Sequence, residues 1–234
     1  MLKRWRALLL LPLLACSGET TSSEQNISLD EVKSLIRPVY FAPLHIKADL
    51  EIERLDDTGV NTYGGELELN RSGISRLRIE QPQTFRLSMT ADSVAFSTGS
   101  SVPLTIDLTS PQHNIVLLRE INVLEFNPFR YLKKDYLYTL DKSRPDTTLI
   151  WIKEKQQKPA YGDIKVVVQP QTGWITDIYF YSIDGDLGRH LRYASPERVG
   201  EFEIPGKVII DHAAQAMVIH EVYRLVNLRP AAEA

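Results

Sequence analysis

Apolar and polar residues alternate with a period of two over much of this chain. The alternation is clearest from Leu44 to Glu53, where every second residue is apolar and the others are polar. Such a pattern is typical of a β-strand with one buried face and one face in water. Comparable patterns predict further strands over residues 66–69, 76–80 and 85–90. Strands are also predicted over residues 136–140, 148–154, 163–168, 174–183, 187–193, 207–211 and 216–226, and several of these are apolar on both faces, as at Trp174-Ile175 and Met217-Val218, which suits central or covered strands. The sequence therefore predicts a mainly β fold.

Turn residues separate these segments at short intervals. They include Thr58-Gly59, Ser72-Gly73, Gln81-Pro82 and Asp184-Gly185, which favour tight connections between neighbouring strands. An antiparallel sheet of about ten strands curls because its right-handed twist accumulates. Such a sheet can fold over into a sandwich that covers itself, or it can leave an apolar concavity open to a ligand.

One short amphipathic helix is predicted from Ser28 to Ile36. Ser28 and Glu31 have the spacing of a capping box, which favours a helix start. Pro38 ends the helix, because the residue before a proline is pushed out of the helical region. The apolar stripe of this helix consists of Leu29, Val32, Leu35 and Ile36. A second irregular region, residues 111–135, lacks clean alternation and is expected to hold one or two short helices near Asn127-Pro128.

The amino terminus has the form of a secretory signal peptide. Lys3, Arg4 and Arg6 precede an apolar run over residues 7–14, which is too short for a membrane-spanning helix of about 20 residues. Leu13-Leu14-Ala15-Cys16 then resembles a bacterial lipobox, which implies cleavage before Cys16 and acylation of its thiol. The alternative is an ordinary signal peptide with an incidental cysteine. Cys16 is the single cysteine of the chain, so an intramolecular disulfide is excluded.

The chain is expected to contain one folded domain. We assign residues 1–15 to the signal peptide, 16–27 to the lipidated cysteine and a polar flexible tether, 28–228 to the domain, and 229–234 to a C-terminal tail. Ser17 follows the cysteine. In enterobacterial lipoproteins an aspartate at that place favours the inner membrane, so Ser17 favours an outer-membrane anchor that faces the periplasm.

Charge and motif content argue against several classes of function. The formal net charge is −3, and loss of the three cationic signal-peptide residues makes it −6, which disfavours nucleic-acid binding. None of the five histidines has a metal-binding spacing such as HExxH, and no GxSxG elbow or phosphate-binding glycine loop is present. We therefore predict a protein that is not an enzyme and that has no cofactor and no metal site.

Several short segments resemble the bacterial lipoprotein-localisation (LolA/LolB-like) family in an ordered set. These segments are 65–71 (GELELNR), 92–96 (DSVAF), 202–205 (FEIP) and 217–222 (MVIHEV). The resemblance implies a curved antiparallel sheet that forms a half-open barrel, with a few short helices as a lid over an apolar cavity. In the family this cavity shields the acyl chains of lipoproteins.

The resemblance also implies roles for particular residues. Arg71 would contact the lid, although the family's following proline is Ser72 here. The helix from Ser28 to Ile36 would belong to the lid. Candidate cavity-lining residues are Leu50, Ile52, Leu67, Leu69, Leu77, Ile79, Phe85, Leu87 and Met89. These residues belong to the core in any strand arrangement, and whether they face a cavity is left open by the alternation.

The sequence leaves two functions open. The first is a lipid-anchored envelope lipoprotein that binds or transfers acyl chains, with a lipoprotein as a possible ligand. The second is a structural or assembly lipoprotein of the outer membrane that docks an envelope protein partner and has no lipid cargo.

The lipobox resemblance generates a direct test. Replacing the lipobox cysteine (Cys16→Ala) should abolish acylation and leave the protein unprocessed or released from the membrane, because no thiol remains to carry the acyl chains. Membrane fractionation after metabolic labelling with a fatty acid measures both effects. Persistent labelling of the variant would contradict the lipobox assignment.

Overall fold

The computed structural model describes residues 24–36, 45–70, 73–80, 84–89, 93–99, 101–107, 136–155, 162–200, 202–214 and 217–231. The expected signal peptide, the lipobox with Cys16, Arg71 and the segment 111–135 lie outside the described residues.

The strands form a single antiparallel sheet with the order β1-β8-β9-β10-β11-β12-β13-β14-β2-β3-β4-β5-β6-β7. Their bounds are β1 Gln25–Ile27, β2 Ile46–Asp56, β3 Gly59–Asn70, β4 Gly73–Ile79, β5 Phe85–Met89, β6 Ser93–Thr98, β7 Leu104–Asp107, β8 Tyr136–Arg144, β9 Thr147–Glu154, β10 Ile164–Gln169, β11 Trp174–Tyr181, β12 Leu187–Val199, β13 Phe202–Ala214 and β14 Met217–Pro230. The predicted mainly β, antiparallel fold is confirmed, and one continuous sheet replaces the alternative of a two-sheet sandwich.

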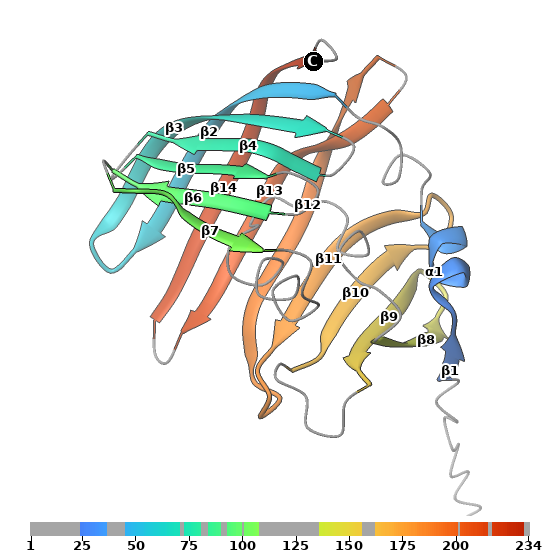
Figure 1. Ribbon diagram of the computed structural model, residues 1–234. Helices are drawn as coiled ribbons and strands as arrows, with labels where there is room; N and C mark the ends of the chain where they lie inside the picture. Colours follow the sequence, from blue (N-terminus) through green and yellow to red (C-terminus); the bar gives the residue numbers. More distant parts are fainter. Residues whose placement is uncertain are drawn as a thin grey trace, which may run out of the picture.

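Two meanders make up the sheet. Strands β2 to β7 and strands β8 to β14 each follow one another in chain order, and β14 pairs with β2 to join them (Figure 1). At the other end of the order, β1 pairs with β8, so that Ile27 lies opposite Tyr138. No pairing among the described strands joins β1 to β7. The sheet is therefore curved but not closed, as a half-open barrel requires.

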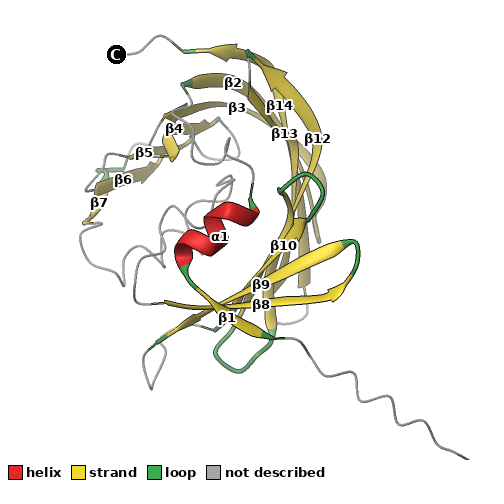
Figure 2. Cartoon of the chain, turned by 90° about the vertical axis from the view of Figure 1, so that its right-hand side faces the viewer, coloured by secondary structure: helices red, strands yellow, loops and turns green. Residues whose placement is uncertain are grey.

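Helix α1 (Leu29–Leu35) lies inside the curve of the sheet (Figure 2). The Ser28 hydroxyl accepts a hydrogen bond from the Glu31 amide, and the Glu31 carboxylate accepts one from the Ser28 amide, which completes the predicted capping box. Val32 and Ile36 are buried in the core of the sheet, and Leu29 and Leu35 pack against it half-buried. The predicted amphipathic helix is thus confirmed with its apolar stripe toward the core.

The sequence pattern missed parts of the sheet and misplaced both ends of the domain. The expected tether includes residues 25–27, but they form β1, and residues 229 and 230 belong to β14. β1 and β7 are too short to show alternation. The hairpin of β12 and β13 is also longer than predicted, and its additional part includes the cross-strand pair Pro196–Pro205. Ser195, next to this pair, has a positive φ of 52°. Prolines and an irregular backbone obscure a period of two in such a hairpin.

Two adjacent glycines in β3 provide a test of the pairing between β3 and β4. A Cβ atom on Gly65 would lie 2.4 Å from the carbonyl oxygen of Arg78, whereas one on Gly64 would meet nothing closer than a Glu80 carboxylate oxygen at 3.8 Å. Gly65→Ala should therefore lower the free energy of unfolding by about 1–3 kcal/mol, because the backbone of β4 must move. Gly64→Ala is the control and should be close to neutral. Urea unfolding measures both, and equal stability of the two variants would contradict the described register.

Candidate functional site

The concave face of the sheet is apolar over both meanders. In β2 to β7 one row of paired residues runs straight across the strands toward the free edge: Ala48, Leu67, Leu77, Leu87, Phe96 and Leu104. The first four are buried, Phe96 is half-buried, and Leu104 is 58% exposed. Along this row the apolar side chains therefore become progressively accessible toward β7, whereas the inward residue Val94 of β6 is fully buried.

The structure brings the described members of the predicted cavity lining onto this one face. Those that are buried are Leu50, Ile52, Leu67, Leu69, Leu77 and Leu87. Ile79 and Phe85 form a cross-strand pair and are half-buried. The side chain of Met89 lies outside the described residues, as Arg71 does.

Sequence reasoning missed that the C-terminal meander contributes equally to the concave face. Its inward residues are Ile150, Ile152, Val166, Ile178, Leu191 and Ile210, all of them almost fully buried. The alternation of these strands is visible in the sequence, but the face that each strand shares with β2 to β5 depends on the pairing of β14 with β2.

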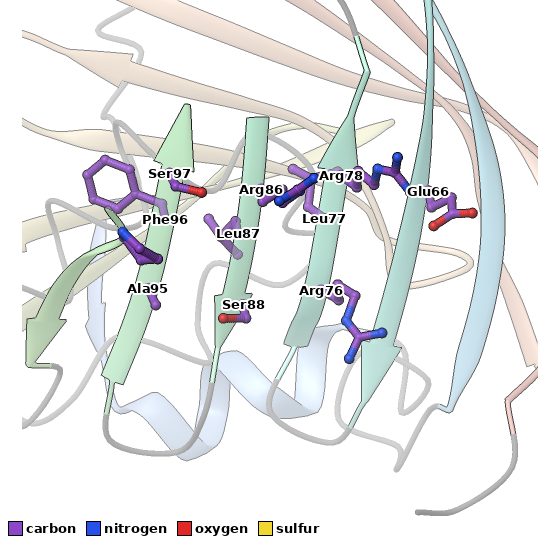
Figure 3. A pocket seen from close by; sticks show the side chains of 11 residues that line it. Glu66, Arg76, Leu77, Arg78, Arg86, Leu87, Ser88, Ala95, Phe96 and Ser97 are labelled. Carbon is purple, nitrogen blue, oxygen red and sulfur yellow. The ribbon is translucent and has the colours of Figure 1, made fainter. Parts of the chain in front are cut away.

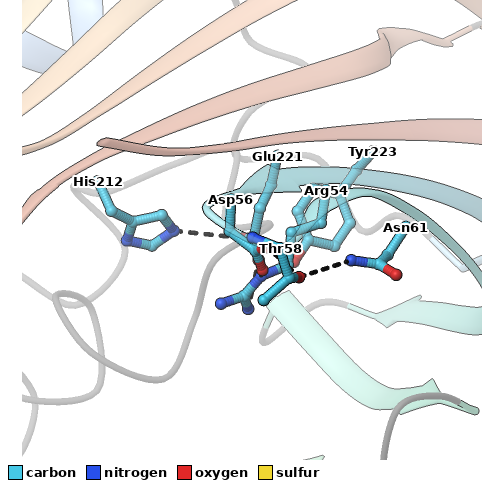
Figure 4. Close-up of polar contacts among 7 residues, drawn as sticks. All are labelled: Arg54, Asp56, Thr58, Asn61, His212, Glu221 and Tyr223. Carbon is cyan, nitrogen blue, oxygen red and sulfur yellow. Dashed lines mark hydrogen bonds and ion pairs between the residues drawn. The ribbon is translucent and has the colours of Figure 1, made fainter. Parts of the chain in front are cut away.

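A cluster of polar side chains interrupts the apolar face where β2, β13 and β14 meet (Figure 4). Glu221 is its centre and is buried. One carboxylate oxygen lies 3.3 Å from Nη1 of Arg54, and the other accepts hydrogen bonds from Tyr223 Oη at 3.1 Å and from His212 Nε2 at 3.2 Å. Arg54 also donates from Nε to Asp56 at 3.0 Å. The cluster therefore satisfies a buried charge with several partners.

Electrostatics favour the ionised form of Glu221. Burial by itself would raise the pKa of this carboxyl, but the hydrogen bond and charge of His212 and the charge of Arg54 outweigh it and hold the pKa below the usual value of 4.5. Burial, together with the neighbouring Glu221 carboxylate, raises the pKa of Tyr223 well above its usual value. The Tyr223 hydroxyl consequently remains a donor toward Glu221.

Arg189 of β12 extends this polar region toward the centre of the concave face. It is buried and lies opposite His212 in the register, and its guanidinium carbon sits 4.6 Å from the centroid of the Phe180 ring. This contact is a cation–π interaction. The concave face thus offers a broad apolar surface with a charged, hydrogen-bonded region at the junction of the two meanders.

A second polar cluster lies on the convex face. His190 is 2.7 Å from Asp177, and His220 is 2.6 Å from Asp211, which also pairs with Arg192 at 3.0 Å. Burial tends to raise the pKa values of both aspartates, but these hydrogen bonds lower them overall. In the described part of the chain no group of three or more His, Cys, Asp or Glu residues is arranged to hold a metal ion.

Comparison with known proteins identifies the fold. No family model matches the chain, and no curated protein matches it in sequence. Among solved structures, a LolA superfamily protein from Nitrosomonas europaea is similar with a TM-score of 0.59 and 13% identity, over 89% of this chain and 96% of that one. A protein domain from Vibrio parahaemolyticus described as a putative outer membrane lipoprotein-sorting protein is similar with a TM-score of 0.59 and 11% identity, over 88% of this chain and 91% of that one. A DUF1329 family protein from Desulfovibrio piger is similar with a TM-score of 0.57 and 11% identity, over 88% of this chain and 92% of that one.

These likenesses show a LolA-like fold, as the sequence resemblance predicted. Among the described helices, none is long and apolar enough to cross a membrane.

Replacement of the central carboxylate tests the polar cluster. Since the pKa of Glu221 is lower in the folded chain than in the unfolded one, its stabilising contribution is present above pH 4.5 and is lost as the pH falls toward the folded-state pKa. Glu221→Gln should cost about 1–3 kcal/mol of unfolding free energy at neutral pH, because Arg54 and His212 lose a charged partner. Its stability should also fall less steeply between about pH 6 and pH 3.

Glu51 provides a control for this comparison, since it is exposed on the same sheet. Glu51→Gln should follow the parent protein at every pH in chemical unfolding. Parallel pH curves for the parent and Glu221→Gln would contradict the role of Glu221.

Proposed function

We propose that this protein is a lipid-anchored lipoprotein of the bacterial envelope that binds or transfers acyl chains, such as those of lipoproteins, on its concave face. The anchor is the acylated Cys16, and the membrane is the outer membrane on its periplasmic side. No covalent chemistry is involved in this function.

The exposure gradient across β2 to β7 is the observation that carries the proposal. Apolar residues that are meant only for a protein core are buried along their whole row, but here the row ends in the half-buried Phe96 and the exposed Leu104. Ile79 and Phe85 beside them are also half-buried. An accessible apolar surface on the inside of a curved sheet is suited to a flexible hydrocarbon ligand.

The driving force would be burial of methylene groups, which contributes about 0.8 kcal/mol for each CH₂. This force is not directional, so it can hold the acyl chains of lipoproteins that differ in sequence. The same chains can be released to a site that buries more of their surface. The LolA-like fold supports this function, because one of the similar structures carries a description as a lipoprotein-sorting protein.

Helix α1 is proposed as part of the lid. It lies inside the curve, and its buried Val32 and Ile36 occupy apolar surface of the sheet (Figure 2). Movement of a helix of seven residues exposes more of that surface at a modest cost. Arg71, which follows the last residue of β3 in the sequence, is proposed to contact the lid.

Docking of an envelope protein partner is the second candidate function, and one observation favours it. At the β11–β12 turn Ile183 is 61% exposed and lines a hollow together with Trp151 and Tyr181, whose rings are stacked, and Leu137 of β8 is 46% exposed. Native mass spectrometry of the unlipidated mature chain separates the two functions. Co-purified lipid supports the acyl carrier, and a clean apo mass with a retained protein partner supports docking.

A single substitution on the concave face tests acyl binding. Phe85→Asn should weaken the affinity for a pyrene-labelled fatty acid several-fold, because an apolar contact surface becomes polar, while the fold is largely spared at this half-buried site. Val60→Asn is the matched control, since Val60 is 65% exposed and lies opposite Leu55, on the convex face. Fluorescence titration measures the affinity. Absence of binding by the parent, or equal affinity of both variants, would contradict the proposal.

A further inference from the structure

The convex face of β3 to β6 contains a hollow of about 560 Å³. Its lining includes Arg76 and Arg78 of β4, Arg86 of β5 and the carboxylate residue Glu66 of β3, together with the small residues Ser88 and Ser97 (Figure 3). The buried Leu77 and Leu87 of the same strands point to the opposite, concave face. The charged side chains of the hollow therefore lie on the opposite face from the apolar surface described above, although Phe96 also lines the hollow. The size of the hollow falls within the range of small-molecule sites.

The register places two positive charges face to face in this hollow. Arg78 and Arg86 are direct partners in the pairing of β4 with β5, and Figure 3 shows them side by side. Arg78 also lies opposite Glu66 of β3, whereas on the far side of Arg86 the partner in β6 is Ser97, which is uncharged. Like charges at directly opposite positions of an antiparallel pair are destabilising.

Neighbouring carboxylates compensate this arrangement only in part. Arg78 is 3.5 Å from Glu80, and Arg76 is 3.9 Å from Glu68, with both arginines well exposed. Among the described residues no ion pair involves Arg86. Elsewhere on the convex face, arginines have an acidic partner on a neighbouring strand, as in the pairs Arg192–Asp211 and Arg224–Glu53. Arg86 is thus the one arginine of the hollow without an acidic partner among the described residues.

We propose that this hollow binds the phosphate group of an anionic ligand. A phosphate placed between Arg78 and Arg86 would turn their repulsion into two sets of charge-assisted hydrogen bonds, and the planar guanidinium fork matches phosphate oxygens in geometry. The hydroxyls of Ser88 and Ser97 can donate further hydrogen bonds to the same oxygens. The remaining volume accommodates the organic part of a small phosphate ester or of a phospholipid headgroup.

Binding measurements on the mature chain, residues 16–234 with Cys16→Ser, test this site. Every described residue is retained in that chain. Isothermal titration with sodium phosphate and with glycerol 1-phosphate, at constant ionic strength set by chloride, should show saturable binding for the parent. Arg86→Ser should weaken it about tenfold or more. Arg224→Ser is the control, because Arg224 lies on the same face outside the hollow. Its side chain is 43% exposed, close to the 44% of Arg78 in the hollow. The Arg224→Ser protein should bind phosphate as the parent does.

Vesicles distinguish the source of the phosphate. Binding to phosphatidylglycerol vesicles but not to phosphatidylcholine vesicles, without binding of the two soluble phosphates, assigns the site to a lipid headgroup and also supports the proposal. In chloride alone Arg86→Ser should unfold at the same temperature as the parent or higher, because a like-charge contact is removed. Failure of the parent to bind any of these probes, or equal binding by Arg86→Ser and Arg224→Ser, would overturn it. None of these results depends on acyl binding at the concave face.

Discussion

The pairing of β14 with β2 is the interaction on which the rest of the structure depends. Every other pair among β2 to β14 joins strands that are neighbours in the sequence, whereas this one joins residues 46–55 to residues 220–230. Without it the two meanders would be separate sheets, each with an apolar face that it could not cover. With it their apolar faces merge into one concave surface around α1.

Polar contacts on both faces reinforce this junction. On the concave face Arg54 of β2 reaches Glu221 of β14, and on the convex face Arg224 pairs with Glu53 and Asn227 donates to Asp49 at 2.8 Å. Glu221 on the concave face is buried, whereas the exposed contacts on the convex face contribute little each. Their arrangement does oppose a shift in register, because a slip by one residue would exchange the two faces and separate every pair.

The two faces of the sheet consequently have different chemistry and support different proposals. The concave face is apolar, becomes accessible toward β7, and carries the proposed acyl-binding surface. The convex face is charged, and its distribution is uneven, with acid–base pairs over β12 to β14 and β2 and an arginine hollow over β4 and β5. A curved single sheet makes this separation possible, because its two faces do not share a core.

The sequence by itself determined the element types and the inward face of each regular strand. The period of two identified Leu50, Leu67 and Leu77 as inward residues, and the Ser28–Glu31 spacing located the helix start, because both patterns are properties of local backbone geometry. The tertiary structure alone decided that β14 lies beside β2, that β1 belongs to the sheet, and that Arg54, His212 and Glu221 meet. Alternation states which face a residue occupies but not which strand is its neighbour. That choice depends on the free energy of the complete sheet, to which residues far apart in the sequence contribute together, such as Asp49 and Asn227, which are 178 positions apart.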